Sequence, residues 1–180
     1  LMGILRYLPN TKLYKNKIID INKDMDIDRD DFINKLFDLG YEKKPVVSRT
    51  GEMAIRGYVI DIFPIEFDNP IRIEFWGDTI DSIKYFDLDD QISNTSVDSV
   101  KIYPYTEFLI DGKIGDNIIR KQKYLLNYSD SVSGLWDYVS DSVIFYYDYN
   151  QIINSYSLLR ENILEYDSEL DDDIKTNYMW

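Results

Sequence analysis

Apolar residues recur at helical spacing in one short stretch near the start of the chain. Between positions 29 and 39 they are Phe32, Ile33, Leu36, Phe37 and Leu39. This spacing places them on one face of a helix, as in helices that pack against another layer. Asp26 or Asp28 can cap the start of this helix, and Gly40 can adopt the left-handed backbone that ends it.

Beyond this helix the hydrophobic pattern takes the period of strands. Segments rich in Val, Ile, Phe and Tyr alternate with turn residues such as Thr50-Gly51, Asp68-Asn69-Pro70 and Gly77-Asp78. The turns are short enough for hairpins, so we expect an α+β fold with a mostly antiparallel sheet and the helix covering one face. The predicted strands lie near residues 44–48, 52–63, 70–76, 79–86 and 97–103.

The flanking residues predict a second group of elements. In chain order these are the end of a helix over 1–8, a strand within 12–22, a helix near 116–126, a buried strand over 143–147, an amphipathic helix over 151–166 and an acidic linker over 167–173. A strand followed directly by a helix is typical of an α/β unit, so residues 143–166 predict part of one.

The composition excludes several kinds of chemistry. The chain contains no His and no Cys. It therefore cannot form a Ser-His-Asp triad, a Cys-His dyad, a thiolate zinc site or a disulfide. A metal site made only of carboxylates stays open. No Gly-x-x-x-x-Gly-Lys phosphate loop occurs in the sequence.

The charge balance is acidic, with 33 Asp and Glu against 20 Lys and Arg and a formal charge of −13. DNA binding comes largely from Lys and Arg that displace counterions, so this balance argues against a DNA-binding surface. No apolar run approaches the roughly 20 residues that span a bilayer, and we expect a cytoplasmic protein without membrane contact. A start at Leu1 rather than Met favours a piece cut from a longer chain.

Two acidic clusters have both a chemical and a simpler interpretation. Asp24, Asp26 and Asp28 resemble the start of a calcium loop, but Arg29 and Lys35 stand where such a loop has Gly and Glu, so a helix-start turn is favoured. The cluster Asp87–Asp90 could supply the acid and base of a carboxylate enzyme, or part of a glycan-binding module. Its position in a predicted turn favours a solvated loop instead.

The predicted strand 70–76 offers the strongest candidate for a binding site. Every second residue is apolar and points to the core, whereas Arg72, Glu74 and Trp76 point to the opposite face. Arg56 and Arg49 fall in the same predicted sheet region. Arg and Trp are favoured in protein-binding hot spots, so this face predicts a partner-binding surface. In the alternative interpretation Trp76 packs under a loop and Arg72 pairs with Glu74 or a nearby Asp.

The same residues carry a resemblance to a known family. The stretches GEMAIRGYVIDIFP at 51–64, PIRIEFWGD at 70–78 and IDSI at 80–83 are similar to the UvrB-like interaction domain of the bacterial transcription-repair coupling factor (Mfd) family. The excision-repair subunit UvrB carries an equivalent domain, but Gln91 and Ser93 look more like the coupling factors. Tyr58 stands where the family has a small residue, and Trp76 replaces a commoner Phe.

The resemblance implies a non-catalytic recruiting role. Coupling factors recognise RNA polymerase stalled at a lesion, move on double-stranded DNA with an ATP- and Mg-dependent motor, and recruit UvrA. The family's UvrA contacts carry over to Arg56, Arg72 and Trp76, with Arg49 and Glu74 as additional candidates. In the family a C-terminal domain masks this surface. We expect neither motor nor cofactor, metal or catalytic residue in this part.

The resemblance also implies a division of the chain. Residues 1–15 would end the first half of a degenerate helicase-like domain, residues 16–104 would form the UvrB-like interaction domain, and residues 105–180 would continue the helicase-like domain as a partial α/β segment. On this view the flanking segments have a structural role, and the chemistry of recognition belongs to the sheet.

Overall fold

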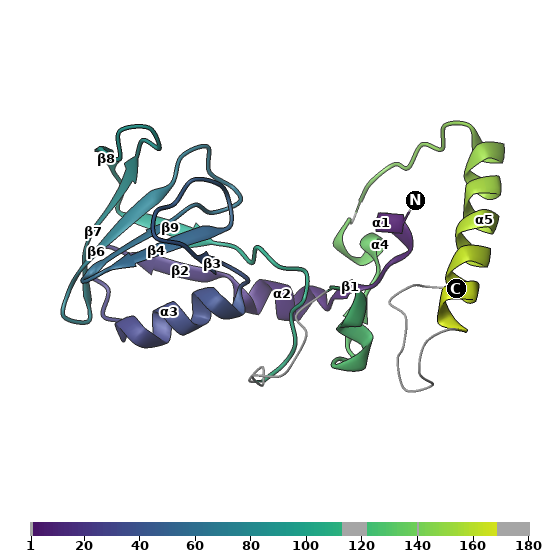
Figure 1. The fold of residues 1–180 in the computed structure, drawn as a ribbon, viewed down its shortest axis with the longest axis horizontal. Coiled ribbons are helices and arrows are strands. Elements are labelled where there is room, and N and C mark those ends of the chain that lie inside the picture. Colours follow the sequence, from purple (N-terminus) through teal and green to yellow (C-terminus); the bar gives the residue numbers. More distant parts are fainter. Residues whose placement is uncertain (1, 113–121, 140, 169–180) are drawn as a thin grey trace. The chain divides into compact units, whose positions relative to one another are not determined.

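The computed structural model describes residues 2–112, 122–139 and 141–168. The chain divides into two compact units, Lys15–Thr106 and the combination of Leu1–Tyr14 with Glu107–Trp180. We call the first the sheet unit and the second the flanking unit. Each is described by itself below (Figure 1).

In the part of the chain that the structure describes, the larger sheet has six strands in the order β3-β4-β5-β6-β7-β8. β3 pairs with β4 in parallel, and the pairs that follow are antiparallel. The predicted α+β class with a mostly antiparallel sheet is therefore confirmed. The strands are β3 Glu42–Lys43, β4 Glu52–Arg56, β5 Val59–Ile62, β6 Ile71–Trp76, β7 Thr79–Phe86 and β8 Ser93–Ser96.

Helix α3, Arg29–Asp38, covers one face of this sheet, as the helical spacing predicted (Figure 1). Asp28 caps the helix by accepting a hydrogen bond from the backbone N–H of Asp31 at 2.7 Å. Gly40 follows the helix with a φ of +91°, the left-handed backbone expected of a helix stop. The cap and the stop therefore lie where the sequence placed them.

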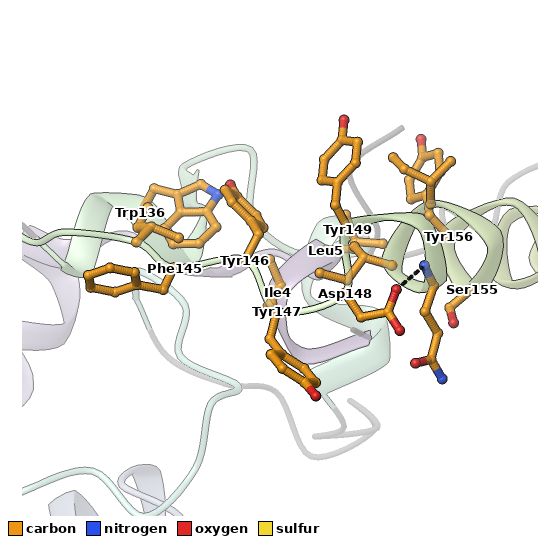
Figure 2. Close-up of a pocket in the computed structure, with 14 residues that line it drawn as sticks. Ile4, Leu5, Trp136, Phe145, Tyr146, Tyr147, Asp148, Tyr149, Ser155 and Tyr156 are labelled. Carbon is orange, nitrogen blue, oxygen red and sulfur yellow. Dashed lines mark hydrogen bonds between the residues drawn. The ribbon is translucent and has the colours of Figure 1, made fainter.

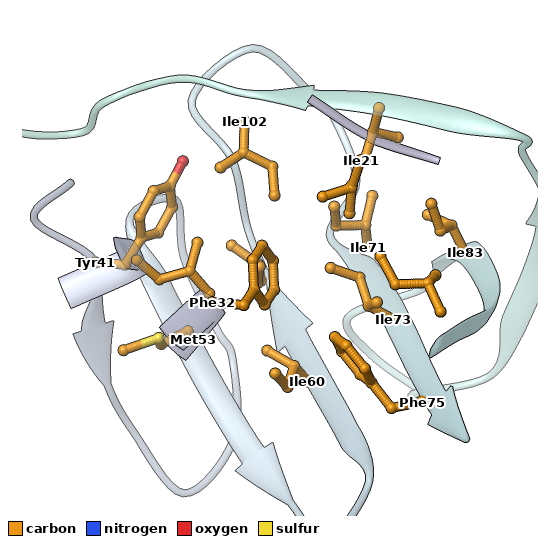
Figure 3. Close-up of a cluster of buried hydrophobic side chains, with 14 of the residues drawn as sticks. Ile21, Phe32, Tyr41, Met53, Ile60, Ile71, Ile73, Phe75, Ile83 and Ile102 are labelled. Atoms are coloured by element: carbon orange, nitrogen blue, oxygen red, sulfur yellow. The ribbon is translucent and has the colours of Figure 1, made fainter. Parts of the chain in front are cut away.

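The core of the sheet unit lies between α3 and the sheet (Figure 3). Phe32 and Leu36 of α3 are fully buried against strand residues such as Ile60 and Ile73. The rings of Phe32 and Phe75 lie 6.0 Å apart between centroids. Burying an aromatic ring of this size contributes roughly 1.5–3 kcal/mol, so the packing of α3 on the sheet stabilises the unit.

A second, two-stranded sheet completes the sheet unit. β2, Ile19–Asn22, pairs antiparallel with β9, Ser99–Ile102, and adds Ile21 and Ile102 to the core. The strand predicted within 12–22 is thus only its last part, because helix α2, Thr11–Lys17, precedes it. The strand predicted at 97–103 forms as β9, but it pairs with β2 rather than with the larger sheet.

Two strand predictions in the larger sheet need correction. The stretch 52–63 is not one strand but the hairpin of β4 and β5, which turns at Gly57 and Tyr58. The predicted strand 44–48 is wrong: the pairing residues are Glu42 and Lys43, and the following segment leaves the sheet. The polar strand β8 has no apolar alternation, and for this reason the sequence did not reveal it.

The flanking unit is built from short elements and one long helix. Tyr138 donates its hydroxyl hydrogen bond to the carbonyl oxygen of Pro9 at 2.6 Å, and burial raises the pKa of Tyr138 to about 12. Phe108, Ile110 and Leu125 form a small core of their own. The elements are α1 Met2–Leu5, β1 Leu8–Pro9, a 3-10 helix Gln122–Asn127, β10 Val132–Ser133, α4 Leu135–Tyr138 and α5 Tyr149–Asp167.

The predictions for this unit were less accurate. Helix 151–166 is confirmed as α5, whereas the buried strand at 143–147 is wrong because these residues pair with no strand among those described and are exposed. Of the helix expected near 116–126, residues 116–121 lie outside the described residues, and so does most of the acidic run 167–173. Among the described helices, none combines the length and apolarity needed to cross a bilayer.

Candidate partner-binding site

Two tight hairpin turns lie at the same end of the larger sheet. The β4–β5 turn is Gly57-Tyr58 and the β6–β7 turn is Gly77-Asp78, closed by the pairs Arg56↔Val59 and Trp76↔Thr79. Both glycines have positive φ, +58° and +63°, the conformation that two-residue hairpin turns assign to glycine. We call this part of the sheet the turn end. It brings together side chains that are far apart in the sequence.

Trp76 is the most exposed large side chain of the turn end. Its relative exposure is 83%, so it does not pack under a loop. A register shift between Glu74 and Phe75 in the β6–β7 pairing precedes it. Such a bulge increases local twist and redirects the strand that follows. The β6 strand therefore ends by presenting an indole to solvent.

Tyr58, in the β4–β5 turn, is 66% exposed. The backbone N–H of Phe75 donates to the carbonyl oxygen of Tyr58 at 2.8 Å, which fixes Tyr58 next to the residue that precedes Trp76. In the sequence, Tyr58 is marked only by its departure from the family pattern. Its exposure follows from the turn, which periodicity alone did not indicate.

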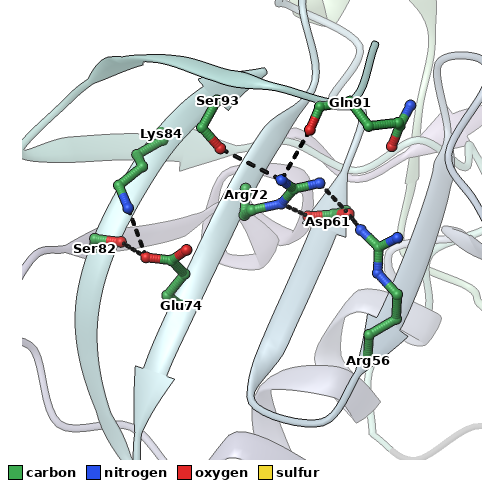
Figure 4. A network of polar contacts seen from close by, with 8 residues as sticks. All are labelled: Arg56, Asp61, Arg72, Glu74, Ser82, Lys84, Gln91 and Ser93. Carbon is green, nitrogen blue, oxygen red and sulfur yellow. Dashed lines mark hydrogen bonds and ion pairs between the residues drawn. The ribbon is translucent and has the colours of Figure 1, made fainter. Parts of the chain in front are cut away.

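Arg72 lies near the start of β6, on the strand face opposite the core (Figure 4). Its Nε donates to Asp61 Oδ1 at 2.7 Å and its Nη2 to Asp61 Oδ2 at 3.0 Å. Its Nη1 donates to the carbonyl oxygen of Gln91 at 3.1 Å and to Ser93 Oγ at 3.4 Å. The guanidinium carbon also lies 4.6 Å from the ring centroid of Phe86. The side chain of Arg72 is only 16% exposed.

Asp61 joins the two arginines of this face. It lies opposite Arg72 in the β5–β6 register and is 1% exposed. Arg56, on β4, donates through Nη2 to the same carboxylate. Its side chain is 46% exposed, so Arg56 is the more exposed of the two arginines. Hydrogen bonding to Asp61 raises the pKa of Arg72, which keeps this cation charged.

The carboxylate of Glu74 on β6 is hydrogen-bonded to side chains of the neighbouring strand β7. Lys84 Nζ donates to its carboxylate at 2.7 Å, and the Ser82 hydroxyl donates to the same oxygen (Figure 4). These hydrogen bonds, from Lys84 above all, lower the pKa of Glu74. The role of Glu74 visible here is to hold β6 against β7.

Arg49 lies at the other end of β4 from Arg56. Because the strand has four residue steps of about 3.3 Å, the two arginines are separated by about 13 Å or more. Arg49 Nε donates to Glu52 Oε1 at 3.1 Å. Burial alone would raise the pKa of Glu52, but hydrogen bonds from Ser48 and Arg49 bring it below its usual value. The structure therefore joins Arg56 and Arg72 through Asp61, places Arg56 and Trp76 at the same end of the sheet, and leaves Arg49 at the other end.

The acidic clusters weighed from the sequence are occupied in local structure. Asp28 caps α3, and Asp26 accepts a hydrogen bond from the hydroxyl of Thr79 at 2.5 Å. Asp87 accepts from the backbone N–H of Asp89 at 2.7 Å in the exposed loop between β7 and β8. Residues of both clusters thus accept hydrogen bonds that stabilise local structure. The interpretation of Asp87–Asp90 as the site of a carboxylate enzyme is not favoured. Within the described residues no group of three or more carboxylates is placed to hold a metal ion.

The flanking unit contains an open apolar groove of about 650 Å³ (Figure 2). Aromatic side chains such as Trp136, Tyr146 and Tyr149 line it, together with Ile4 and residues of α5. Its carboxylate, Asp148, accepts a hydrogen bond from the backbone N–H of Gln151 and so caps α5. The groove thus offers apolar surface without a convergent set of polar groups.

The sequence pattern predicted Arg56 and Trp76 as surface residues of one sheet region, and the exposure of both agrees with this. The alternative in which Arg72 pairs with a nearby Asp is also confirmed, but the pattern did not identify that residue as Asp61. A carboxylate between isoleucines on a strand was the signal that could have revealed it. An Asp in such a position needs a cation across the sheet, and the antiparallel register brings Arg72 opposite.

Comparison with known proteins identifies a family whose model matches this chain. A family model described as the UvrB interaction domain matches residues 19–108, half of the chain. This range contains α3, the whole larger sheet and the turn end. The match therefore falls on the unit that carries the candidate site.

Curated relatives agree with this match. The chain is 37% identical over 114 residues to a transcription-repair-coupling factor of Staphylococcus aureus (strain bovine RF122 / ET3-1), covering 63% of this chain and 10% of that protein. It is 38% identical over 110 residues to the one of Staphylococcus haemolyticus, covering 61% and 9%. For Staphylococcus epidermidis the values are 33% over 129 residues, 72% and 11%. The chain spans about one tenth of the length of these relatives.

Proposed function

The chain belongs to the UvrB interaction domain family, and on this basis we propose that its sheet unit is a non-catalytic surface that recruits UvrA during transcription-coupled nucleotide excision repair. The observation that carries the proposal is the family match over 19–108, because that range includes the exposed Trp76 and Arg56 of the turn end. Trp and Arg are the side chains that most often dominate binding energy at protein interfaces.

The proposal identifies the longer parent as a transcription-repair coupling factor. The relatives described above bear that name, which favours this parent over UvrB, whose equivalent domain was the alternative. In the parent, contacts with RNA polymerase and double-stranded DNA, and an ATP- and Mg-dependent motor, would belong to segments other than this chain. A C-terminal domain of the parent would mask the surface until the polymerase is engaged. Recruitment of UvrA would take place in the bacterial cytoplasm.

An adaptor role agrees with the chemistry of the sheet unit. The buried carboxylate of Asp61 is neutralised by two arginines, that of Glu52 is paired with Arg49, and Glu74 is paired with Lys84. Such satisfied pairs are suited to holding a surface in shape rather than to proton transfer. We therefore assign neither a reaction nor a cofactor to this part of the protein.

Titration of purified UvrA with the chain tests the proposal. We expect wild-type binding, and a loss of roughly 30- to 1000-fold for the double variant Arg56→Ala/Trp76→Ala, which corresponds to about 2–4 kcal/mol. Ile65→Ser is the matched control, because Ile65 is also exposed but follows β5 at the opposite end of the sheet. Circular dichroism checks that each variant is folded. Equal affinities of wild type and double variant would refute the assignment.

A further inference from the structure

We propose that the sheet unit carries a second binding site, a groove that takes the guanidinium of an arginine side chain presented by an extended segment of a partner protein. The groove has a volume of about 540 Å³, which lies within the roughly 300–1,000 Å³ typical of ligand sites. It is lined by residues of β2, β9, the end of β7 and the connection between β5 and β6. This site is independent of the proposed recruitment of UvrA.

The groove lies at the opposite end of the larger sheet from the turn end. β5 begins and β6 ends at the turn end, so the connection between them, which contains Glu66 and Phe67, is at the other end. Tyr85, the residue of β7 that lines the groove, pairs with Ile71 at the start of β6. A ligand in the groove would thus contact no residue of the turn end.

Glu66 supplies an unpaired carboxylate to the groove. No described residue donates a hydrogen bond to it or forms an ion pair with it, and its partial burial raises its pKa. A carboxylate that loses water without gaining a partner has a destabilised charged form. A guanidinium would replace the lost water with two parallel N–H···O bonds, an arrangement that the ammonium of a lysine cannot make.

The charges of the groove favour a single cation. Asp20 and Glu66 contribute two carboxylates and Lys101 contributes one ammonium, so the lining residues carry one uncompensated negative charge. Lys101 Nζ lies 3.7 Å from Asp20 Oδ1, and both side chains are more than half exposed. Such an exposed ion pair is weak, and it leaves the charge of Glu66 unmatched. The acidic balance of the whole chain, −13, also favours a cationic ligand over an anionic one.

Phe67 and Tyr85 favour a guanidinium over an ammonium. Their rings lie 5.6 Å apart between centroids in an edge-to-face arrangement, and both side chains are half-buried against the core. An edge-to-face pair covers at most one face of one ring, so ring surface is left for the groove that both residues line. A guanidinium is planar and weakly hydrated, and it stacks on such rings.

Asn22 and Ser99 favour an arginine within a peptide over a free amino acid. They lie opposite each other in the β2–β9 register, and both are exposed and line the groove. Neither side chain has a hydrogen-bond partner among the described residues, so an amide and a hydroxyl are available to the backbone of a peptide. Free arginine also brings a carboxylate, which the acidic groove repels.

NMR titration of the isotope-labelled chain with the capped peptide Gly-Gly-Arg-Gly-Gly tests the proposal. We expect saturable shifts of the backbone amides of Phe67, Tyr85 and Lys101, with a Kd of about 1 mM. The same peptide with citrulline, which has the shape of arginine without its charge, should bind about tenfold more weakly. Free arginine should bind at least about threefold more weakly than the peptide.

Three outcomes of this titration would overturn the proposal. Equal affinities for the arginine and citrulline peptides would exclude recognition of a guanidinium. Equal affinities for the peptide and free arginine would exclude a protein segment as its source. Shifts that do not saturate, or that fall only outside the groove, would exclude the site itself.

Matched variants of the chain assign the binding to particular side chains. Glu66→Gln should weaken binding of the arginine peptide about tenfold, whereas Asp68→Asn, in the same connection but outside the groove, should change it less than about twofold. Tyr85→Leu should weaken it about threefold, and Tyr85→Phe, which keeps the ring, should bind like wild type. Urea denaturation checks that each variant is folded. Wild-type affinity of Glu66→Gln would overturn the proposal.

Titration with UvrA separates this site from the proposed function. Glu66→Gln should bind UvrA with the affinity of the wild type, and a parallel loss of UvrA and peptide binding would overturn the independence of the groove. A wild-type chain that binds the peptide but not UvrA would refute the proposed function and leave this inference standing.

Discussion

In the sheet unit, alternate residues of β6 are buried against α3, whereas in the flanking unit the apolar run from Val143 to Tyr147 stays exposed, with Phe145 at 89%. Both stretches contain Ile and aromatic residues. β6 has β5 and β7 beside it in matched register, and residues 143–147 pair with no described strand. An apolar run becomes a buried strand only when a neighbouring strand and a covering layer are present.

Limited proteolysis gives the largest expected effect. Chymotrypsin should cut after Phe145, Tyr146 or Tyr147 at least about 100-fold faster than after Phe75 or Phe86, because cleavage within the sheet requires cooperative opening of the unit. Mass spectrometry of fragments over time measures both rates. Comparable early cutting inside β6 or β7 would contradict the difference between the two units.

Matched Phe substitutions should show the same difference in stability. Phe32→Ala removes a fully buried ring between α3 and the sheet and should lower the free energy of unfolding by about 3–5 kcal/mol. Phe145→Ala should change it by less than about 0.5 kcal/mol, since its ring is already in water. Urea denaturation followed by circular dichroism measures both. Similar costs for the two variants would be evidence against the assigned burial.

Two glycine substitutions, one in each unit, test how strongly the fold constrains the backbone at these positions. A Cβ on Gly51, whose φ is +86°, would come within 2.3 Å of the Tyr105 ring, so Gly51→Ala should cost more than about 2 kcal/mol. Gly112, in the flanking unit, has a φ of +88° but nothing within 4 Å of an added Cβ, and Gly112→Ala should cost about 1 kcal/mol. Thermal denaturation ranks the two, and the reverse order would count against the packing of Tyr105 on Gly51.

Acid should destabilise the sheet unit through Glu52 and Glu74. Their pKa values are lowered in the folded state, so in the unfolded chain they bind protons at higher pH, near 4.5. As pH falls from that value through the lower folded pKa, the unfolded state binds more protons and the free energy of unfolding decreases. The stabilisation is complete above the unfolded pKa.

Urea midpoints between pH 7 and pH 3 measure this dependence. Glu52→Gln should flatten the acid limb, and the control Glu161→Gln, on the exposed surface of α5, should leave its slope unchanged. An identical slope for wild type and Glu52→Gln would show that Glu52 does not contribute.

The sequence was sufficient to predict those elements whose hydrophobic pattern matches the way they pack against their neighbours in the fold. The spacing from Phe32 to Leu39 gave α3, and alternation gave β6 and β7 within a residue of their bounds. It failed where the decisive information was a contact between distant residues. Gly57 within an apolar stretch gave no sign of a turn, and the partner of Arg72 depended on register, which places Asp61 opposite it. The exposure of Tyr58 and Trp76 followed from those same turns.

The pairing of β2 with β9 has a consequence for how the sheet unit relates to the rest of its polypeptide. Ile19 lies opposite Ile102, so the chain enters and leaves this unit on adjacent antiparallel strands, about 5 Å apart. A segment with neighbouring ends can be inserted into a loop of another protein without separating the host's own residues. The sheet unit thus has the neighbouring ends that insertion into a loop of an unrelated carrier requires.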